Sequence, residues 1–98
     1  MHDQAVAALE LEIDLRRGLE TGELRVAYQP LISLADRKLV GFEALVRWRN
    51  SAGEEICPDE FVPLAEETGL IVAVDRWVLF EACSRVAVWR TIPGCEDL

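Results

Sequence analysis

Two segments with the alternating pattern of β-strands, residues 24–34 and 39–48, are separated by only four residues. A parallel connection between strands needs about a dozen residues or more, so this short connection allows only an antiparallel hairpin. A turn centred between Asp36 and Arg37 predicts that Gln29 lies opposite Ala44, with the register open by a residue or two. The rest of the chain must therefore be arranged around an antiparallel pair of long strands.

The second strand separates apolar from polar side chains within the stretch Gly41–Trp48. Because successive side chains point to opposite faces of a strand, Glu43, Leu45 and Arg47 share one face. The opposite face is apolar and comprises Phe42, Ala44, Val46 and Trp48. A carboxylate suited to a divalent metal and a guanidinium suited to phosphate then lie on one surface. The alternative is a half-exposed strand whose charged side chains are simply solvated.

Residues 3–21 are predicted to form a helix that carries two apolar stripes. One stripe consists of Val6, Leu9 and Ile13, and a neighbouring stripe contains Leu15 and Leu19. The three- and four-residue spacings are typical of helix faces. Gly22 is a typical residue for ending such a helix.

The second half of the chain is predicted to be mainly helical. Residues 50–55 have the composition of a loop, and residues 58–62 are expected to make a short helical turn. Pro63 then begins a helix that ends before Gly69, since proline at the first helical position loses no hydrogen bond. A further helix is predicted for residues 72–90. Its apolar stripe consists of Val74, Trp77, Val78, Ala82, Val86 and Trp89.

The composition argues against several classes of protein. With 98 residues, 51% of them hydrophobic, the chain is long enough for one small domain. Its net charge of -8 argues against a partner such as DNA or RNA, which needs a basic face. The wide spacing of Cys57, Cys83 and Cys95, with His2 as the single histidine, does not match a zinc site and suits a reducing cytoplasm. We identify no signal peptide and no apolar run of about 18 residues that would span a membrane.

Several motifs follow one another in a fixed order. They are Tyr28-Gln29-Pro30, Gly41–Trp48, Phe61–Ile71 and Trp77-Val78-Leu79. Their order and spacing resemble the start of an EAL domain, the cyclic-di-GMP phosphodiesterase family, from about Leu11 to about Arg90. The resemblance implies an α/β fold: the N-terminal part of a TIM-like (β/α)8 barrel with an antiparallel first strand, here incomplete. A barrel of this class takes about 250 residues.

The resemblance also implies how the chain is divided. Residues 1–22 are expected to be a lead or linker helix, similar to the helix that joins a GGDEF domain to a following EAL domain. Met1 would then be an internal methionine. Residues 23–98 would be the N-terminal part of a truncated EAL domain, with the family's remaining metal ligands beyond Leu98.

The chemistry implied by the resemblance assigns a role to four residues. Hydrolysis of a phosphodiester needs an activated water and stabilised phosphate charge, which two divalent metals about 3.5–4 Å apart supply. By resemblance Glu43 is a ligand of Mg2+ or Mn2+, and Gln29, Leu45 and Arg47 bind the substrate, Leu45 through its backbone. The residues alone leave other readings open. Glu43 could be solvated, Gln29 could cap the strand end and Leu45 could only pack. Arg47 could pair with Glu43, although about 13 Å of strand would separate them.

The implied function is that of a fragment of a cyclic-di-GMP-specific phosphodiesterase, a hydrolase that converts cyclic-di-GMP to linear pGpG with a divalent metal. Because one glutamate cannot hold two metals, the chain by itself is expected to be inactive. With two uncovered strands it is also expected to be marginally stable. The alternatives are a degenerate EAL-type module that binds cyclic-di-GMP or a protein without cleavage, and a short product that serves only as an interaction piece. Homodimerisation through the complete EAL domain is a further implication.

Overall fold

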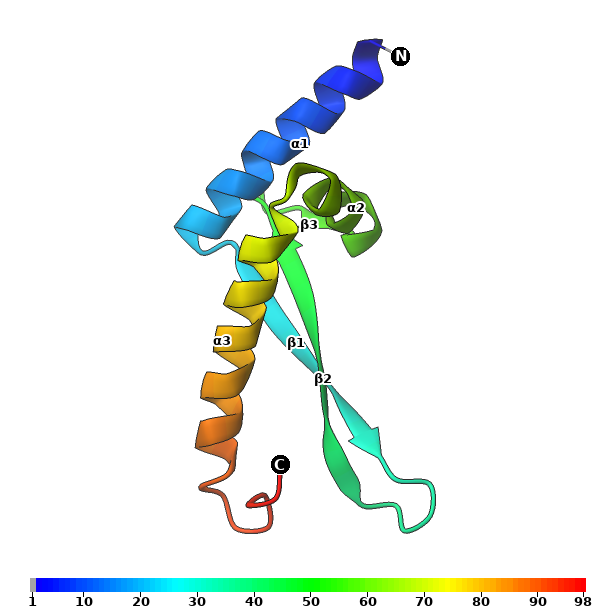
Figure 1. Cartoon of the computed structure of the whole chain (residues 1–98), viewed down its shortest axis with the longest axis vertical. Coiled ribbons are helices and arrows are strands. Elements are labelled where there is room, and N and C mark those ends of the chain that lie inside the picture. Colours follow the sequence, from blue (N-terminus) through cyan, green and yellow to red (C-terminus); the bar gives the residue numbers. More distant parts are fainter. Residues whose placement is uncertain (1) are drawn as a thin grey trace.

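The computed structural model describes residues 2–98, with side chains from residue 3 onward (Figure 1). The expected internal methionine, Met1, lies outside these residues. The elements in chain order are α1 (His2–Thr21), β1 (Leu24–Ile32), β2 (Leu39–Arg49), β3 (Glu55–Ile56), α2 (Pro58–Thr68) and α3 (Ile71–Trp89). The predicted α/β class is confirmed, and the three strands form one antiparallel sheet in the order β1-β2-β3. Among the described helices, none is both long enough and apolar enough to cross a membrane.

The predicted hairpin is confirmed, but its register differs from the expected one by a single residue. Gln29 lies opposite Glu43, and Ala44 lies opposite Tyr28. The cause is the turn, which is centred earlier in the loop than expected, because Ile32 pairs with Leu39; the irregularity between Leu31 and Ile32 then shifts the pairing by one residue toward the expected register. Arg37, in the turn itself, has a left-handed backbone with φ of 57°. Such local backbone geometry is not visible in a pattern of apolar and polar residues.

The prediction of a loop for residues 50–55 is wrong at its last residue. Glu55 begins the short strand β3 and pairs with Arg49 of β2. The Asn50 side chain makes the preceding turn, because its Oδ1 accepts the backbone N–H groups of Ala52 and Glu54, each at 3.0 Å. This turn folds the chain back onto β2 and forms a strand too short to show an alternating pattern.

The prediction that Pro63 begins a helix is also wrong. Pro58 occupies the start of α2, and Pro63 lies inside this single helix of 11 residues. Pro63 removes one internal hydrogen bond from α2. The buried side chains of Phe61 and Ala65, on either side of it, hold the helix against the core. Gly69 ends α2 as expected, with φ of 80°.

The core lies where α1, α2 and the start of α3 meet one end of the sheet. Its buried side chains are Leu15, Leu24, Trp48, Phe61, Ala65, Leu70 and Val74. Trp48 is 0% exposed and packs edge-on against Phe61, with ring centroids 5.4 Å apart. Its indole N–H also donates a hydrogen bond to Oε1 of Glu23 at 3.0 Å. The fold is therefore organised around one tryptophan near the end of β2.

The two apolar stripes of α1 face in opposite directions, so the prediction of neighbouring stripes is wrong. Leu15 is fully buried in the core, whereas Leu9 and Ile13 are exposed. A helix turns about 100° per residue, so Leu15 points about 200° away from Ile13, which precedes it by two positions. Only one side of α1 therefore packs against the rest of the chain.

Gly18 of α1 provides a test of this packing. A Cβ atom at this position would lie 3.0 Å from the Trp48 indole nitrogen and 3.0 Å from Oε1 of Glu23. Alanine improves helix propensity by about 1 kcal/mol, but the buried indole cannot move away. We expect Gly18→Ala to lower the free energy of unfolding by about 1–2 kcal/mol, measured by urea denaturation. Gly41→Ala is the matched control, because no atom lies within 4 Å of its added Cβ. Equal stability of the two variants would contradict the close approach of Gly18 to Trp48.

Candidate functional site

The hairpin has one face covered by α3 and one uncovered face. On the covered face, the Trp89 ring of α3 packs against Tyr28 and Phe42, with ring centroids 4.9 and 4.7 Å apart. Val26 and Val46 lie directly opposite each other on this same face. Figure 1 shows α3 running along the hairpin on this side. The other face of the hairpin is therefore the one available to a ligand.

All four residues predicted to form a site lie on the uncovered face. Glu43 and Gln29 are directly opposite each other and exposed, and Leu45 follows Glu43 on the same face. Directly opposite residues in an antiparallel pair have Cβ atoms about 4.5–5.5 Å apart. The hairpin thus brings together Gln29 and Glu43, which 14 positions of sequence separate.

Arg47 lies further along the same face, where Arg25 is its partner on β1. Its Nη1 donates a hydrogen bond to the backbone oxygen of Val46 at 3.2 Å. Within residues 3–98, no ion pair joins Arg47 to Glu43, so the internal pairing considered for these two residues is not formed. The guanidinium remains half-buried on the uncovered face.

Three further residues of this face were missed by sequence reasoning. Nη2 of Arg25 lies 2.6 Å from Oε1 of Glu55, and Nη2 of Arg49 lies 3.3 Å from the same oxygen. The hydrogen bond from Arg25 is the main cause that holds the pKa of the Glu55 carboxyl below its ordinary value of 4.5. One carboxylate therefore binds two of the three arginines that gather near the end of the sheet. The alternation of β1 already placed Arg25 on the face of Gln29, but β3, which carries Glu55, gave no sequence signal.

The ion pairs of Glu55 predict a small pH dependence of stability. Because the pKa of Glu55 is lower in the folded chain than in the unfolded chain, its carboxylate stabilises the fold above pH 4.5. This contribution is lost as the pH falls through the lowered folded value. In Glu55→Gln it is absent, so the variant should lose less stability than the parent chain between pH 7 and about pH 3. The difference should be small and should shrink in high salt, since these groups are exposed.

Urea denaturation at several pH values measures this difference. Glu54→Gln is the matched control, because it removes a neighbouring glutamate that is not part of the ion pairs. Identical pH profiles for Glu55→Gln and the parent chain would show that the ion pairs contribute nothing to stability.

The uncovered face carries oxygen ligands suited to a divalent metal, but not a complete set of them. The carboxylate of Glu43 and the amide oxygen of Gln29 are oxygen donors of the kind that Mg2+ and Mn2+ prefer. Among the described residues, no three side chains of histidine, cysteine, aspartate or glutamate gather as a metal-binding group. The donor type fits such a metal, and among the described residues Glu43 is a carboxylate of this face that is not paired with an arginine.

The fold of the chain matches solved structures of similar proteins. The chain superimposes on the MucR phosphodiesterase of Pseudomonas aeruginosa in complex with c-di-GMP, with a TM-score of 0.81 and 42% identity. The match covers 90% of this chain and 35% of that one. A model of the EAL domain family matches residues 12–96. The chain belongs to the EAL domain family.

Curated relatives agree with this assignment. An uncharacterized signaling protein of Caulobacter vibrioides is 47% identical over 90 residues, which are 92% of this chain and 11% of the relative. The bifunctional diguanylate cyclase/cyclic di-GMP phosphodiesterase MucR of P. aeruginosa is 43% identical over 91% of this chain and 13% of its own length. The FimX EAL domain of P. aeruginosa, solved bound to c-di-GMP, matches with a TM-score of 0.70 and 36% identity over 79% of this chain and 32% of that one. The chain thus spans about a tenth of the length of these curated relatives.

Proposed function

We propose that the chain is the N-terminal part of a cyclic-di-GMP phosphodiesterase, with residues 1–22 as a lead helix and residues 23–98 as the beginning of the EAL domain. The observation that carries the proposal is that Gln29, Glu43 and Arg47 share the face of the hairpin that α3 does not cover. The c-di-GMP complex of the MucR phosphodiesterase, 42% identical, supports cyclic-di-GMP as the ligand. The reaction would open the cyclic dinucleotide to linear pGpG.

Each residue of the face has a distinct proposed role. The carboxylate of Glu43 would hold Mg2+ or Mn2+, which when bound supplies an activated water and stabilises the charge on the phosphate. The guanidinium of Arg47 would bind phosphate oxygens, a contact that arginine can make with two parallel hydrogen bonds. The Gln29 amide would contact the substrate beside Glu43, and Leu45 would contact it through its backbone. A single carboxylate cannot complete a two-metal site, so the isolated chain is proposed to be inactive.

The proposal also covers the preceding domain, the cellular location and the oligomeric state of the longer protein. MucR is a bifunctional diguanylate cyclase and phosphodiesterase, which supports a cyclase domain of the GGDEF type ahead of residues 1–22. The unpaired, widely spaced cysteines Cys57, Cys83 and Cys95 support a cytoplasmic location. Homodimerisation of the complete EAL domain is proposed as well.

A binding module is the second candidate function. The FimX EAL domain bound to c-di-GMP is the observation that favours it, since an EAL fold can hold this ligand. Glu43 and Arg47 favour the enzyme, because a module that only binds the dinucleotide has no need of the metal-binding carboxylate.

A chimaera separates the two candidates. Residues 12–96 would replace the matched stretch of the MucR phosphodiesterase domain, which supplies the rest of the barrel. We expect the folded chimaera to convert cyclic-di-GMP to pGpG with Mg2+ and to stop when the metal is chelated, whereas the 98-residue chain gives no product. Binding without cleavage by a chimaera that melts cooperatively would favour the binding module. Neither binding nor cleavage by such a chimaera would contradict both candidates.

A further inference from the structure

The N-terminal half of α1 carries an apolar stripe that the proposed function does not use. Val6, Leu9 and Ile13 are 41%, 56% and 49% exposed. Residues 3–10 are exposed without interruption, and Figure 1 shows this half of α1 projecting beyond α2. An ordinary surface helix exposes its polar side and buries its apolar side, whereas this helix exposes an apolar stripe as well. The exposed stripe is therefore available to a partner.

The body of the protein leaves the stripe accessible. Leu11, Leu15 and Leu19 pack against the core from the opposite side of α1. A second helix could therefore lie along Val6, Leu9 and Ile13 without meeting α2 or the sheet of its own chain.

The spacing and residue types of the stripe match a two-stranded coiled coil. Val6, Leu9 and Ile13 follow one another at intervals of three and four, which are the a, d and a positions of a heptad. β-Branched residues at a and leucine at d favour parallel pairs of helices over larger bundles. We propose that α1 pairs in parallel with α1 of a second copy of this chain, through a seam formed by these three residues. The inference does not depend on catalysis.

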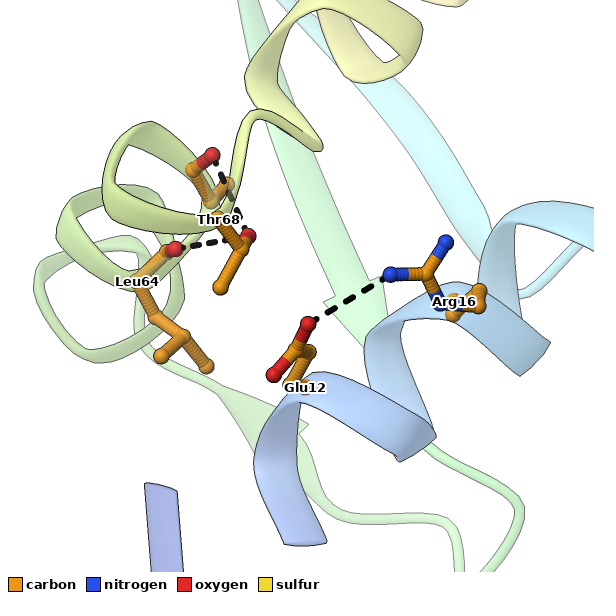
Figure 2. A network of polar contacts seen from close by, with 5 residues as sticks. Glu12, Arg16, Leu64 and Thr68 are labelled. Atoms are coloured by element: carbon orange, nitrogen blue, oxygen red, sulfur yellow. Dashed lines mark hydrogen bonds and ion pairs between the residues drawn. The ribbon is translucent and has the colours of Figure 1, made fainter. Parts of the chain in front are cut away.

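One pair of charges beside the seam favours the parallel arrangement. In a parallel pair, Glu12 of one helix at position g faces Arg17 of the other helix at position e, which places opposite charges together. An antiparallel pair centred on the stripe would instead bring the two copies of Glu10 near each other. A parallel pair would also bring the two copies of Arg16 together at the next seam position, so the apolar seam ends there. Nη2 of Arg16 lies 3.4 Å from Oε1 of Glu12 in its own helix (Figure 2), and Nη1 of Arg17 lies 3.7 Å from Oδ1 of Asp14.

A seam of three residues gives a weak dimer, so the sharpest test is a covalent trap. The free cysteines Cys57, Cys83 and Cys95 would first be replaced by serine in the 98-residue chain. Val6→Cys is then incubated with oxidised glutathione. A parallel seam brings the two copies of position 6 together, within the Cα separation of about 6 Å that a disulfide needs. We expect a disulfide-linked dimer.

Two further variants make the trap specific. Ala7→Cys, exposed on the same part of α1 but turned about 100° from position 6, should give little linked dimer. Leu9→Lys, added to Val6→Cys, should abolish the link because it places a charge at the centre of the seam. Leu9 is exposed in the single chain, so circular dichroism should show that the fold of this variant is retained.

Several results would overturn the proposal. They are no linked dimer from Val6→Cys, equal linking from Ala7→Cys, or a link that survives Leu9→Lys. The last result would show that copies associate through another surface, such as the uncovered strands. A link that forms between Val6→Cys and Ile13→Cys chains, and not between two Val6→Cys chains, would show antiparallel pairing.

Discussion

Replacing Trp48 with alanine is expected to unfold the chain. Trp48 is 0% exposed, packs against Phe61 and donates its indole N–H to Glu23. Truncating a buried aromatic residue costs about 3–5 kcal/mol, because transfer free energy is lost and a cavity remains. A small single core supplies little more than about 5 kcal/mol of net stability. The variant should therefore lack a cooperative unfolding transition in urea and should show reduced helical circular dichroism at 25 °C.

The matched control is the truncation of an exposed aromatic residue. Phe80 of α3 is 71% exposed, so Phe80→Ala should change the free energy of unfolding by less than about 0.5 kcal/mol. If Trp48→Ala unfolds at the same urea concentration as Phe80→Ala, the core is not organised around Trp48. Exposed apolar residues such as Leu34, Leu79 and Phe80 are a physical reason to expect that this chain is marginally stable.

Loss of the Glu43 carboxylate is expected to abolish most of the phosphodiesterase activity of the chimaera. Glu43→Gln keeps the size and one oxygen of the side chain but removes the charge that would hold the metal. Losing a group that merely supports a metal ligand costs about 10–100-fold, so losing the ligand itself should lower kcat by at least about 100-fold. The Mg2+ concentration needed for half-maximal activity should also rise. Both quantities are measured from the rate of pGpG formation across a range of Mg2+ concentrations.

Glu67→Gln is the matched control for this substitution. Glu67 is an exposed glutamate near the end of α2, away from the uncovered face of the hairpin. Its replacement should leave both kcat and the Mg2+ requirement unchanged. Turnover that survives Glu43→Gln with the same Mg2+ requirement would show that Glu43 is not a metal ligand. The assignment of the chain to the EAL domain family would not be affected.

The sequence predicted the elements that depend on local signals. Four residues between two alternating segments required an antiparallel pair, and alternation placed Glu43 and Arg47 on one face of it. The helices α1 and α3 were predicted to within one residue at each described end, since their apolar spacings are regular. The order of the motifs identified the family, which the comparison over residues 12–96 confirmed.

The tertiary structure decided features that depend on contacts between distant residues. Pro63 lies inside α2 because the core holds Phe61 and Ala65 on either side of it. Glu55 binds Arg25 only because β2 lies between their strands and brings both to one face.

The two apolar stripes of α1 show the same contrast between what the sequence specifies and what tertiary packing decides. The sequence by itself determined that both stripes exist, together with the hairpin and the polar face that carries Glu43. Only packing decided that Leu15 is buried while Leu9 stays exposed. Spacing along a chain specifies which residues share a face, because backbone geometry is periodic. Which face meets the core, and which residues of another element lie opposite, depends on the free energy of burying surfaces that are far apart in the sequence.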